Sequence, residues 1–249
     1  MFFSPREDVI PGELFSISHL IMFIIFIILI IIGLYLSRNL KRIKIKKLTK
    51  IIGLIVAVLE IAKITYNFIT GAFLLDQWVP LSFCSIFIYS CLISGFSNKG
   101  CKYSDAFIGS VAFVSGLAYL VFPTTSLTEV PAWHFLSVHS FIYHSLMVYL
   151  GLIYLIRGIG KPNKQNFKYF TIYTTIFVIL ALILNKIYDT NLMLLMHQFG
   201  IYPTVIDKLV KYHLYTIIAV LVYMFLPYGI SYFVSKLVYK SPENIKTEN

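Results

Sequence analysis

Charged residues are scarce in this sequence. Asp, Glu, Lys and Arg make up 13% of its 249 residues, and 58% of the residues are hydrophobic. A soluble domain usually carries about 25% charge, and a water-soluble fold of this length could not bury so much apolar surface in one core. In a bilayer, a helix that faces lipid is apolar all round. The composition therefore excludes an ordinary soluble domain and predicts an integral membrane protein.

Cysteine is scarce too, and its spacing argues against two kinds of site. The three cysteines, Cys84, Cys91 and Cys101, form no CxxC pair and no disulfide framework. The sequence also lacks an HExxH motif and a Cys/His quartet. We therefore expect neither a metal site nor a cofactor.

Long apolar runs are what the sequence has instead. A helix needs roughly 20 mostly apolar residues to cross a bilayer, and seven stretches meet this need. They are residues 17–36, 51–73, 79–96, 106–122, 133–156, 170–188 and 212–234. We predict an all-α, polytopic membrane helix bundle of seven transmembrane helices, which forms a single domain over residues 1–249.

The connections between these spans alternate in charge. Sixteen Lys or Arg residues fall on the side that includes the C-terminal tail, and three fall on the other side. Basic residues collect in cytoplasmic loops, so we predict an outside N-terminus and a cytoplasmic C-terminus in a multi-pass protein of the cell membrane. This asymmetry also accounts for the net charge of +10. The expected partners are membrane lipids, and no nucleic acid partner is expected.

Ionisable groups inside a span are costly and usually face the bundle interior, where they indicate function. In span 51–73, the residues Glu60, Lys63 and Asn67 lie on one helical face. Two interpretations fit this spacing. Glu60 and Lys63 form either a self-neutralising pair that holds helices together or a site that acts on a substrate.

Span 133–156 carries three histidines. At a rise of 1.5 Å per residue, His139 lies roughly 9 Å deep, His144 roughly 17 Å deep, and Cys84 roughly 8 Å below the outer boundary of its own span. We expect His134 at the mouth of the bundle, in contact with water. His139 and His144 point about 140° apart around the helix, which disfavours a shared metal.

Two further polar residues, Asn185 and His213, lie near the outer boundaries of their spans. With Cys84, His139 and Asn67 they lie in the outer half of the bundle, whereas Glu60 and His144 lie nearer mid-depth. We assume that these groups converge. Residues 189–211 leave two possibilities open: this segment lies in the interface or folds back over the outer mouth, or the sixth span runs longer.

Four segments carry a resemblance to a known family. They are WVPLSFCSI, DAFIGSVAFVSGLAYLVFPTTSL, VPAWHFLSVHSFIYHSLMVYLGLIY and NKIYDTNLMLLMH. In order and spacing they resemble the bacterial YwaF-type integral membrane proteins, which are similar to the eukaryotic transmembrane protein 164 family. The resemblance covers about residues 79–199.

The matching motifs are short. Pro80, Leu81 and Cys84 match a Pro-Leu-x-x-Cys motif, and Leu120 and Pro123 match Leu-x-x-Pro. The family histidine is best matched by His144, and an Asn-x-x-x-x-x-Asn block is matched by Asn185 and Asn191. The chain departs from the family in having Ser82 where His or Gln is frequent, and Leu192 where Tyr is frequent.

The resemblance implies a chemistry, because the eukaryotic relatives are implicated in moving acyl chains between phospholipids with a cysteine nucleophile and a histidine. It implies a phospholipid acyltransferase in which Cys84 takes an acyl group from a lipid as a thioester and passes it to a lipid hydroxyl. The resemblance favours His144 as the base, and the depth argument favours His139, so both stay candidates. Asn67 or Asn185 would donate to the oxyanion.

Supporting or substrate-binding roles go to Glu60, Lys63, Asn191 and His213. Two alternatives stay open. A small transporter or channel would use Glu60, Lys63 and the histidines to relay protons or to bind a solute. A membrane scaffold would need no chemistry at all.

Overall fold

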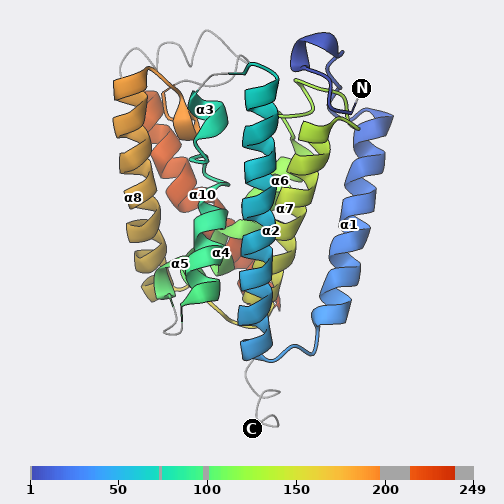
Figure 1. Ribbon diagram of the computed structural model, residues 1–249. Coiled ribbons are helices and arrows are strands. Elements are labelled where there is room, and N and C mark those ends of the chain that lie inside the picture. The colour runs from blue at the N-terminus through green and yellow to red at the C-terminus, as the bar shows by residue number, and fades with distance from the viewer. Residues whose placement is uncertain (1, 73–74, 98–100, 197–213, 239–249) are drawn as a thin grey trace.

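The structure, a computed structural model, describes residues 2–72, 75–97, 101–196 and 214–238. Every regular element in these stretches is a helix, which confirms the predicted all-α fold. Figure 1 shows the long helices packed side by side in one bundle, with the first residues of the chain over one end. We call this the N-terminal end of the bundle. The opposite end is called the basic end, because α2 begins there with the sequence RIKIKK.

Within the described residues, the chain passes seven times between the two ends (Figure 1). The passages are α1 (Ile17–Ser37), α2 (Arg42–Ile69), α3 (Leu75–Trp78) with α4 (Ile86–Phe96), α5 (Lys102–Phe107) with η2 (Ile108–Ala112) and α6 (Phe113–Val121), α7 (Phe135–Ile156), α8 (Lys164–Tyr188) and α10 (Leu214–Val238). Two short 3-10 turns, η1 (Arg6–Asp8) and η3 (Leu192–Leu194), precede α1 and follow α8. Five passages are continuous helices long and apolar enough to cross a membrane, namely α1, α5 to α6, α7, α8 and α10.

The central helix of the bundle is α7. It contacts α1, α2, α6, η2 and α10, and large side chains such as Phe141 and Tyr154 are completely buried on it. On α1, by contrast, Ile24 is 55% exposed and Ile28 is 50% exposed. A large exposed apolar surface of this kind marks contact with a membrane, so lipid covers the outer face of α1.

A π-helical turn, η2, interrupts the helix between α5 and α6. A Cβ atom on Gly109 would lie 2.1 Å from the carbonyl oxygen of Ile159, so the chain that follows α7 crosses this turn in backbone contact. Ser110 Oγ donates a hydrogen bond to the Gly160 carbonyl at 3.1 Å. A π turn adds one residue to a helix and is frequent beside functional sites. Here it precedes α6, which lines an interior cavity.

The predicted span 79–96 is helical only in its second half, α4. Pro80 has no N–H group to donate to a helix, and Ser82 Oγ accepts a hydrogen bond from the Ser85 N–H at 3.1 Å. Non-helical backbone at membrane depth is tolerated only where protein or a cavity surrounds it. Residues 79–85, which we call the unwound segment, therefore mark an interior site.

A polar cluster joins four helices towards the basic end. Lys46 Nζ of α2 lies 2.7 and 2.8 Å from the two carboxylate oxygens of Asp105 in α5. Ser94 Oγ of α4 donates to Asp105 at 2.5 Å. Tyr154 Oη of α7 lies 3.0 Å from Ser94 Oγ and 2.9 Å from Thr49 Oγ1. Each member has a partner in the cluster, so it clamps α2, α4, α5 and α7 together.

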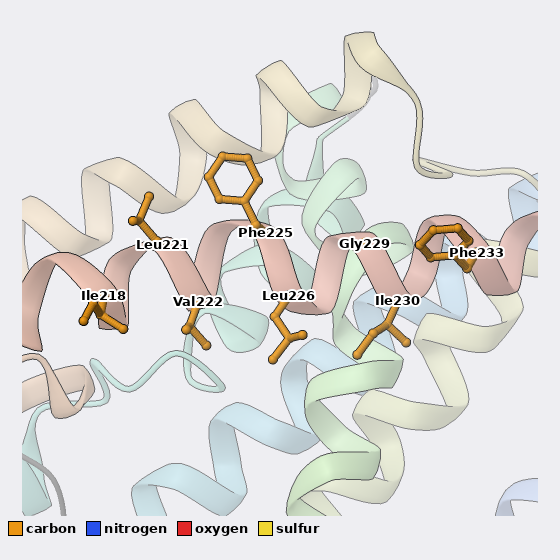
Figure 2. Close-up of a pocket in the computed structure, with 8 residues that line it drawn as sticks. All are labelled: Ile218, Leu221, Val222, Phe225, Leu226, Gly229, Ile230 and Phe233. Atoms are coloured by element: carbon orange, nitrogen blue, oxygen red, sulfur yellow. The ribbon is translucent and has the colours of Figure 1, made fainter. Parts of the chain in front are cut away.

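The last described helix, α10, contacts α6, α7 and α8. Pro227 stands inside it and removes one backbone hydrogen bond. A shallow hollow on its outer face (Figure 2) is lined by Ile218, Leu221, Val222, Phe225, Leu226, Gly229, Ile230 and Phe233. Within the described chain, a Cβ atom on Gly229 would meet no atom within 4 Å. This apolar surface is therefore open and faces outward.

Candidate functional site

An interior cavity of about 720 Å³ lies between α2, α6, α7 and α10. The unwound segment and η3 complete its walls. Seven of the candidate site residues from the sequence line it: Glu60, Lys63, Asn67, Cys84, His139, His144 and Asn191. These side chains come from distant parts of the chain and face one space. The volume lies within the range of ligand pockets, about 300–1,000 Å³.

Cys84 lies where the unwound segment meets α4. Tyr143 Oη of α7 donates a hydrogen bond to the Cys84 carbonyl at 3.0 Å, which ties this turn to the central helix. Because α4 begins two residues later, its first backbone N–H groups follow the cysteine directly. Of the three cysteines, all of which the structure describes, only Cys84 lines the cavity. Cys91 is completely buried in the core.

The ring of His144 is held in one orientation. Its Nδ1 lies 2.7 Å from the Ser140 carbonyl oxygen, so Nδ1–H donates this bond. The neutral ring then keeps a lone pair on Nε2, which can accept a proton. The ring also stacks on Tyr119 of α6, with centroids 3.6 Å apart and planes 8° apart. His144 is therefore a positioned proton acceptor on the cavity wall.

His139 lines the same cavity, but its ring is not fixed by hydrogen bonds. Both ring nitrogens are buried, and neither makes a hydrogen bond of good geometry within the described residues, although the ring lies close to the Leu59 backbone. Its nearest aromatic neighbours are Phe135 and Tyr143, at centroid distances of 6.0 and 6.3 Å. Across the described chain, no hydrogen bond joins Cys84 to either histidine. The thiol and the imidazoles share a cavity and are separate in this state.

Glu60 and Lys63 form an ion pair on the α2 wall. Lys63 Nζ lies 2.5 Å from Glu60 Oε1, and the Glu60 side chain is 7% exposed. The pair neutralises itself, which is one of the two interpretations that the spacing left open. It also faces the cavity, so a role towards a bound molecule is compatible with its place.

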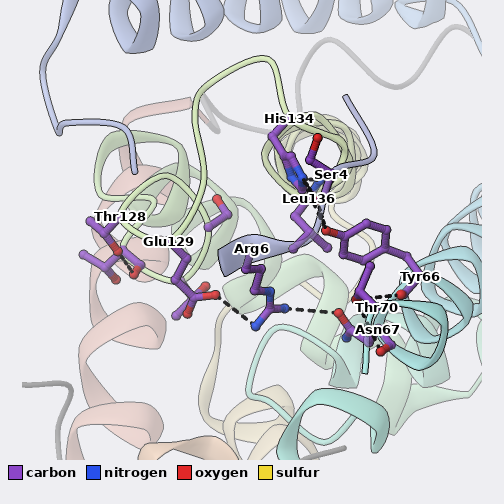
Figure 3. A network of polar contacts seen from close by, with 12 residues as sticks. Ser4, Arg6, Tyr66, Asn67, Thr70, Thr128, Glu129, His134 and Leu136 are labelled. Atoms are coloured by element: carbon purple, nitrogen blue, oxygen red, sulfur yellow. Dashed lines mark hydrogen bonds and ion pairs between the residues drawn. The ribbon is translucent and has the colours of Figure 1, made fainter. Parts of the chain in front are cut away.

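The N-terminal segment, residues 2–16, makes polar contacts with α2 and with the loop between α6 and α7 at the N-terminal end of the bundle (Figure 3). Arg6 lines the cavity, and its Nη1 lies 3.2 Å from Glu129 Oε2. Arg6 Nη2 donates to Asn67 Oδ1 at 3.2 Å. These contacts join the first residues of the chain to α2 and to the loop between α6 and α7.

His134 is completely covered by this segment, so the expectation that it contacts water is wrong: it is 1% exposed. Its Nε2 donates to the Ser4 carbonyl at 2.9 Å, and its Nδ1 accepts from the Leu136 N–H at 3.2 Å, which caps α7 (Figure 3). Burial lowers the pKa of His134, the Ser4 carbonyl partly opposes this, and the charge of Arg6 lowers the pKa further.

The two asparagines of the later block hold η3 in the cavity wall. Asn185 Oδ1 accepts from the Leu192 N–H at 2.7 Å, and its Nδ2 donates to the Leu192 carbonyl at 3.1 Å. Asn191 Oδ1 accepts from the Met196 N–H at 3.0 Å. Asn185 is buried and is not one of the lining residues. Its amide therefore acts on the backbone of η3.

The chain after α8 turns back towards the bundle. Asp189 ends α8 in the left-handed conformation, with φ of 49°, and Leu192 and Met193 are buried in the cavity wall. The alternative of a longer sixth span is therefore wrong for residues 189–196, which fold back. His213 and residues 197–211 lie outside the described residues.

Tyrosines are the cavity residues that the sequence argument missed. Tyr119, Tyr143 and Tyr223 all line the cavity, and the Tyr223 ring stacks on Phe83 of the unwound segment at 4.7 Å. Tyrosines near span ends, such as Tyr119, are expected in an interfacial belt. The available signal was the position of Tyr143 and Tyr223 in the middle of their spans, where a hydroxyl group needs a polar partner.

The fold and the cavity define the class: this is a polytopic integral membrane protein whose helix bundle surrounds a partly open cavity with polar side chains in its lining. The model of the TMEM164 family matches residues 14–230. The chain therefore belongs to the TMEM164 family, as the motif resemblance indicated. The search of curated proteins and the search of solved structures each gave no match.

Proposed function

We propose that the protein is a phospholipid acyltransferase of the cell membrane, in which Cys84 carries the acyl group as a thioester. One observation supports this most: a thiol and a positioned imidazole acceptor, His144, face one cavity inside a lipid-embedded bundle. A thiolate is the reactive form of cysteine, and it needs a base to form. The chemistry implied for the family uses the same two residue types.

The first half of the reaction loads the cysteine. His144 Nε2 takes the thiol proton of Cys84, and the thiolate attacks the carbonyl carbon of a lipid ester. A tetrahedral intermediate forms and the ester C–O bond breaks. The imidazolium returns the proton to the departing lysolipid oxygen, which leaves the acyl group on sulfur. The thiol and the imidazole must approach for this step, and catalytic contacts often tighten only when substrate is bound.

The second half reverses these roles with a new acceptor. His144 takes the proton of an acceptor lipid hydroxyl, and this oxygen attacks the thioester carbonyl. The C–S bond breaks, and the imidazolium returns the proton to the Cys84 thiolate. The two halves exchange one ester for another, so no oxidant, reductant or cofactor is required.

The donor for the intermediate oxygen is the side-chain amide of Asn67, which lines the cavity. The N–H groups of Phe87 and Ile88 at the start of α4 already donate to backbone carbonyls. We assign Asn185 and Asn191 a supporting role, because they hold η3 in the wall.

The test is acyl transfer in vesicles. Purified protein is reconstituted with a phosphatidylcholine that carries a deuterated acyl chain and with a lysophospholipid acceptor. Mass spectrometry should find the labelled chain on the acceptor and on Cys84, and hydroxylamine should release it from the protein. Cys84→Ala should lose both signals, and Cys91→Ala, in the adjacent helix but buried away from the cavity, is the matched control. Equal transfer by wild type and Cys84→Ala would rule out the thioester.

A second candidate function is solute or proton transport. It is favoured by the unwound segment and by the Glu60–Lys63 pair, because transporters use broken helices and buried charges at their binding sites. Flux of a labelled solute into proteoliposomes that is lost in Glu60→Gln and kept in Cys84→Ala would support this function.

A further inference from the structure

One row of side chains separates the cavity from the outer surface of the bundle. Val222, Leu226 and Ile230 line the interior cavity and also line the outer hollow of α10. They recur every four residues, so they share one side of the helix. Figure 2 shows these three side chains pointing to one side of α10, and Leu221 and Phe225 pointing to the other.

This row is exposed although it belongs to the cavity lining. Val222 is 43%, Leu226 57% and Ile230 41% exposed. On α6, which contacts α10, the cavity-lining residue Ala118 is exposed as well, and Phe122, directly after α6, is 54% exposed. Because the side chains of this row contact both the cavity and the outer surface, the wall between the two is one side chain thick here.

We propose that a lipid acyl chain enters the cavity sideways from the bilayer, between α6 and α10, along the track formed by Val222, Leu226 and Ile230. The track is apolar on both sides, so it fits a hydrocarbon chain and offers nothing to a polar solute. The inference rests on the proposed function only where it concerns transfer of the bound acyl group, because entry of an acyl chain by this route does not need the Cys84 thiol.

The other approach to the cavity is covered by polar contacts. At the N-terminal end, Arg6 lies across the cavity and is held by Glu129 and Asn67. A chain that entered there would first have to leave the bilayer and pass through water, at the cost of exposing its whole apolar surface. The lateral route avoids this exposure. Pro227, which removes a hydrogen bond from α10, stands in the part of the helix that carries the track.

The experiment uses vesicles that contain a phosphatidylcholine with a diazirine group in its acyl chain. Photolabelling is carried out on the full chain and on Cys84→Ala, and labelled residues are mapped by mass spectrometry. We expect label on interior residues such as Tyr143 and Phe83, which are 4% and 7% exposed. Ile28 on the lipid-facing side of α1 provides the internal reference in the same sample.

Two pairs of variants test the route. Leu226→Trp should lower interior labelling, relative to α1, by about tenfold, because the added bulk fills the opening. Ile217→Trp is the matched control on α10, since Ile217 is 56% exposed and Leu226 57% exposed. Ala118→Phe narrows the opening from α6, and Leu117→Phe, which is not at the cavity, is its control.

Interior labelling that is missing in the full chain and in Cys84→Ala would overturn the proposal. The proposal would also fail if interior labelling survived in both Leu226→Trp and Ala118→Phe, or if it fell equally in the two control variants. If interior labelling follows the expected pattern while Cys84→Ala keeps full acyl transfer, the proposed function fails and the lateral route stands.

Discussion

The two cavity histidines of α7 differ in how well their ring nitrogens are hydrogen-bonded. His144 has its Nδ1 satisfied by the Ser140 carbonyl, whereas the buried nitrogens of His139 make no hydrogen bond of good geometry among the described residues and only approach the Leu59 backbone. A buried polar group that is poorly hydrogen-bonded costs free energy. We therefore propose that a bound molecule hydrogen-bonds His139 and that His144 is the base.

Replacement of each histidine by phenylalanine separates these roles. His144→Phe keeps a ring against Tyr119 and removes the proton acceptor, so acyl transfer should fall by about 10²–10⁴-fold, the usual contribution of a general base. His139→Phe removes a buried polar group that is poorly hydrogen-bonded, and its melting temperature in detergent should equal or exceed that of wild type. The opposite pattern of transfer rates would identify His139 as the base.

We predict that attachment of the N-terminal segment to the bundle depends on pH through His134. Its pKa is lowered while the N-terminal segment covers it, and it returns to about 6.5 when the segment detaches. The detached state therefore binds the proton more tightly. The contribution of His134 to attachment is complete above about pH 6.5 and is lost as the pH falls below it. A protonated Nδ1 also cannot accept from the Leu136 N–H.

The measurement is hydrogen exchange of residues 2–16, corrected for intrinsic rates, at pH 7.5 and pH 5.5. Exchange in this segment should rise at the lower pH in wild type. His134→Asn keeps a capping side chain without a titrating group, so its exchange should depend much less on pH. The same pH dependence in both proteins would show that another group controls the cover.

Among the elements, the unwound segment is the one that hydropathy misjudged. Residues 79–96 are apolar enough to read as a span, and a Pro at position 80 is tolerated in the first turn of a helix. Apolar run length reports that a segment lies in the membrane, but it does not report whether the backbone hydrogen bonds are made within a helix. Here the side chains of Ser82 and Ser85 provide local partners, and the helix starts late.

We predict that loss of the Lys46–Asp105 ion pair, which joins α2 and α5, lowers the stability of the bundle. Loss of one partner from a buried ion pair costs about 3–5 kcal/mol. Asp105→Asn should cost less than this, because the Lys46 side chain is 23% exposed. Lys47→Ala, at the exposed neighbouring position, should leave the melting temperature in detergent unchanged. A Lys46→Met/Asp105→Asn double variant should recover part of the loss, and a full additive loss would show that the two groups do not act as a pair.

For the whole molecule, the membrane fold could be predicted from the sequence, whereas the site could be predicted only in part. Charge asymmetry and apolar runs report on the solvent around each helix, so they predicted an all-α bundle. The depth of Cys84, Asn67 and His139 also predicted a shared level. Which side chains meet depends on how helices rotate against one another, and hydropathy carries little of that information. The sequence therefore could not show Arg6 closing the cavity or Tyr143 holding the Cys84 carbonyl.

We predict that the basic end of the bundle faces the cytoplasm and the N-terminal end faces outside. The loop between α6 and α7 and the segment before α2 lie at opposite ends of the bundle (Figure 1). Thr128 and Lys44 are exposed at these two ends. A single cysteine is placed at either position in a chain whose native cysteines are alanine. Because basic residues stay cytoplasmic, a membrane-impermeant maleimide should label Thr128→Cys in intact cells and should label Lys44→Cys only after permeabilisation. The reverse pattern would mean that the N-terminal cover and the Arg6 end of the cavity face the cytoplasm.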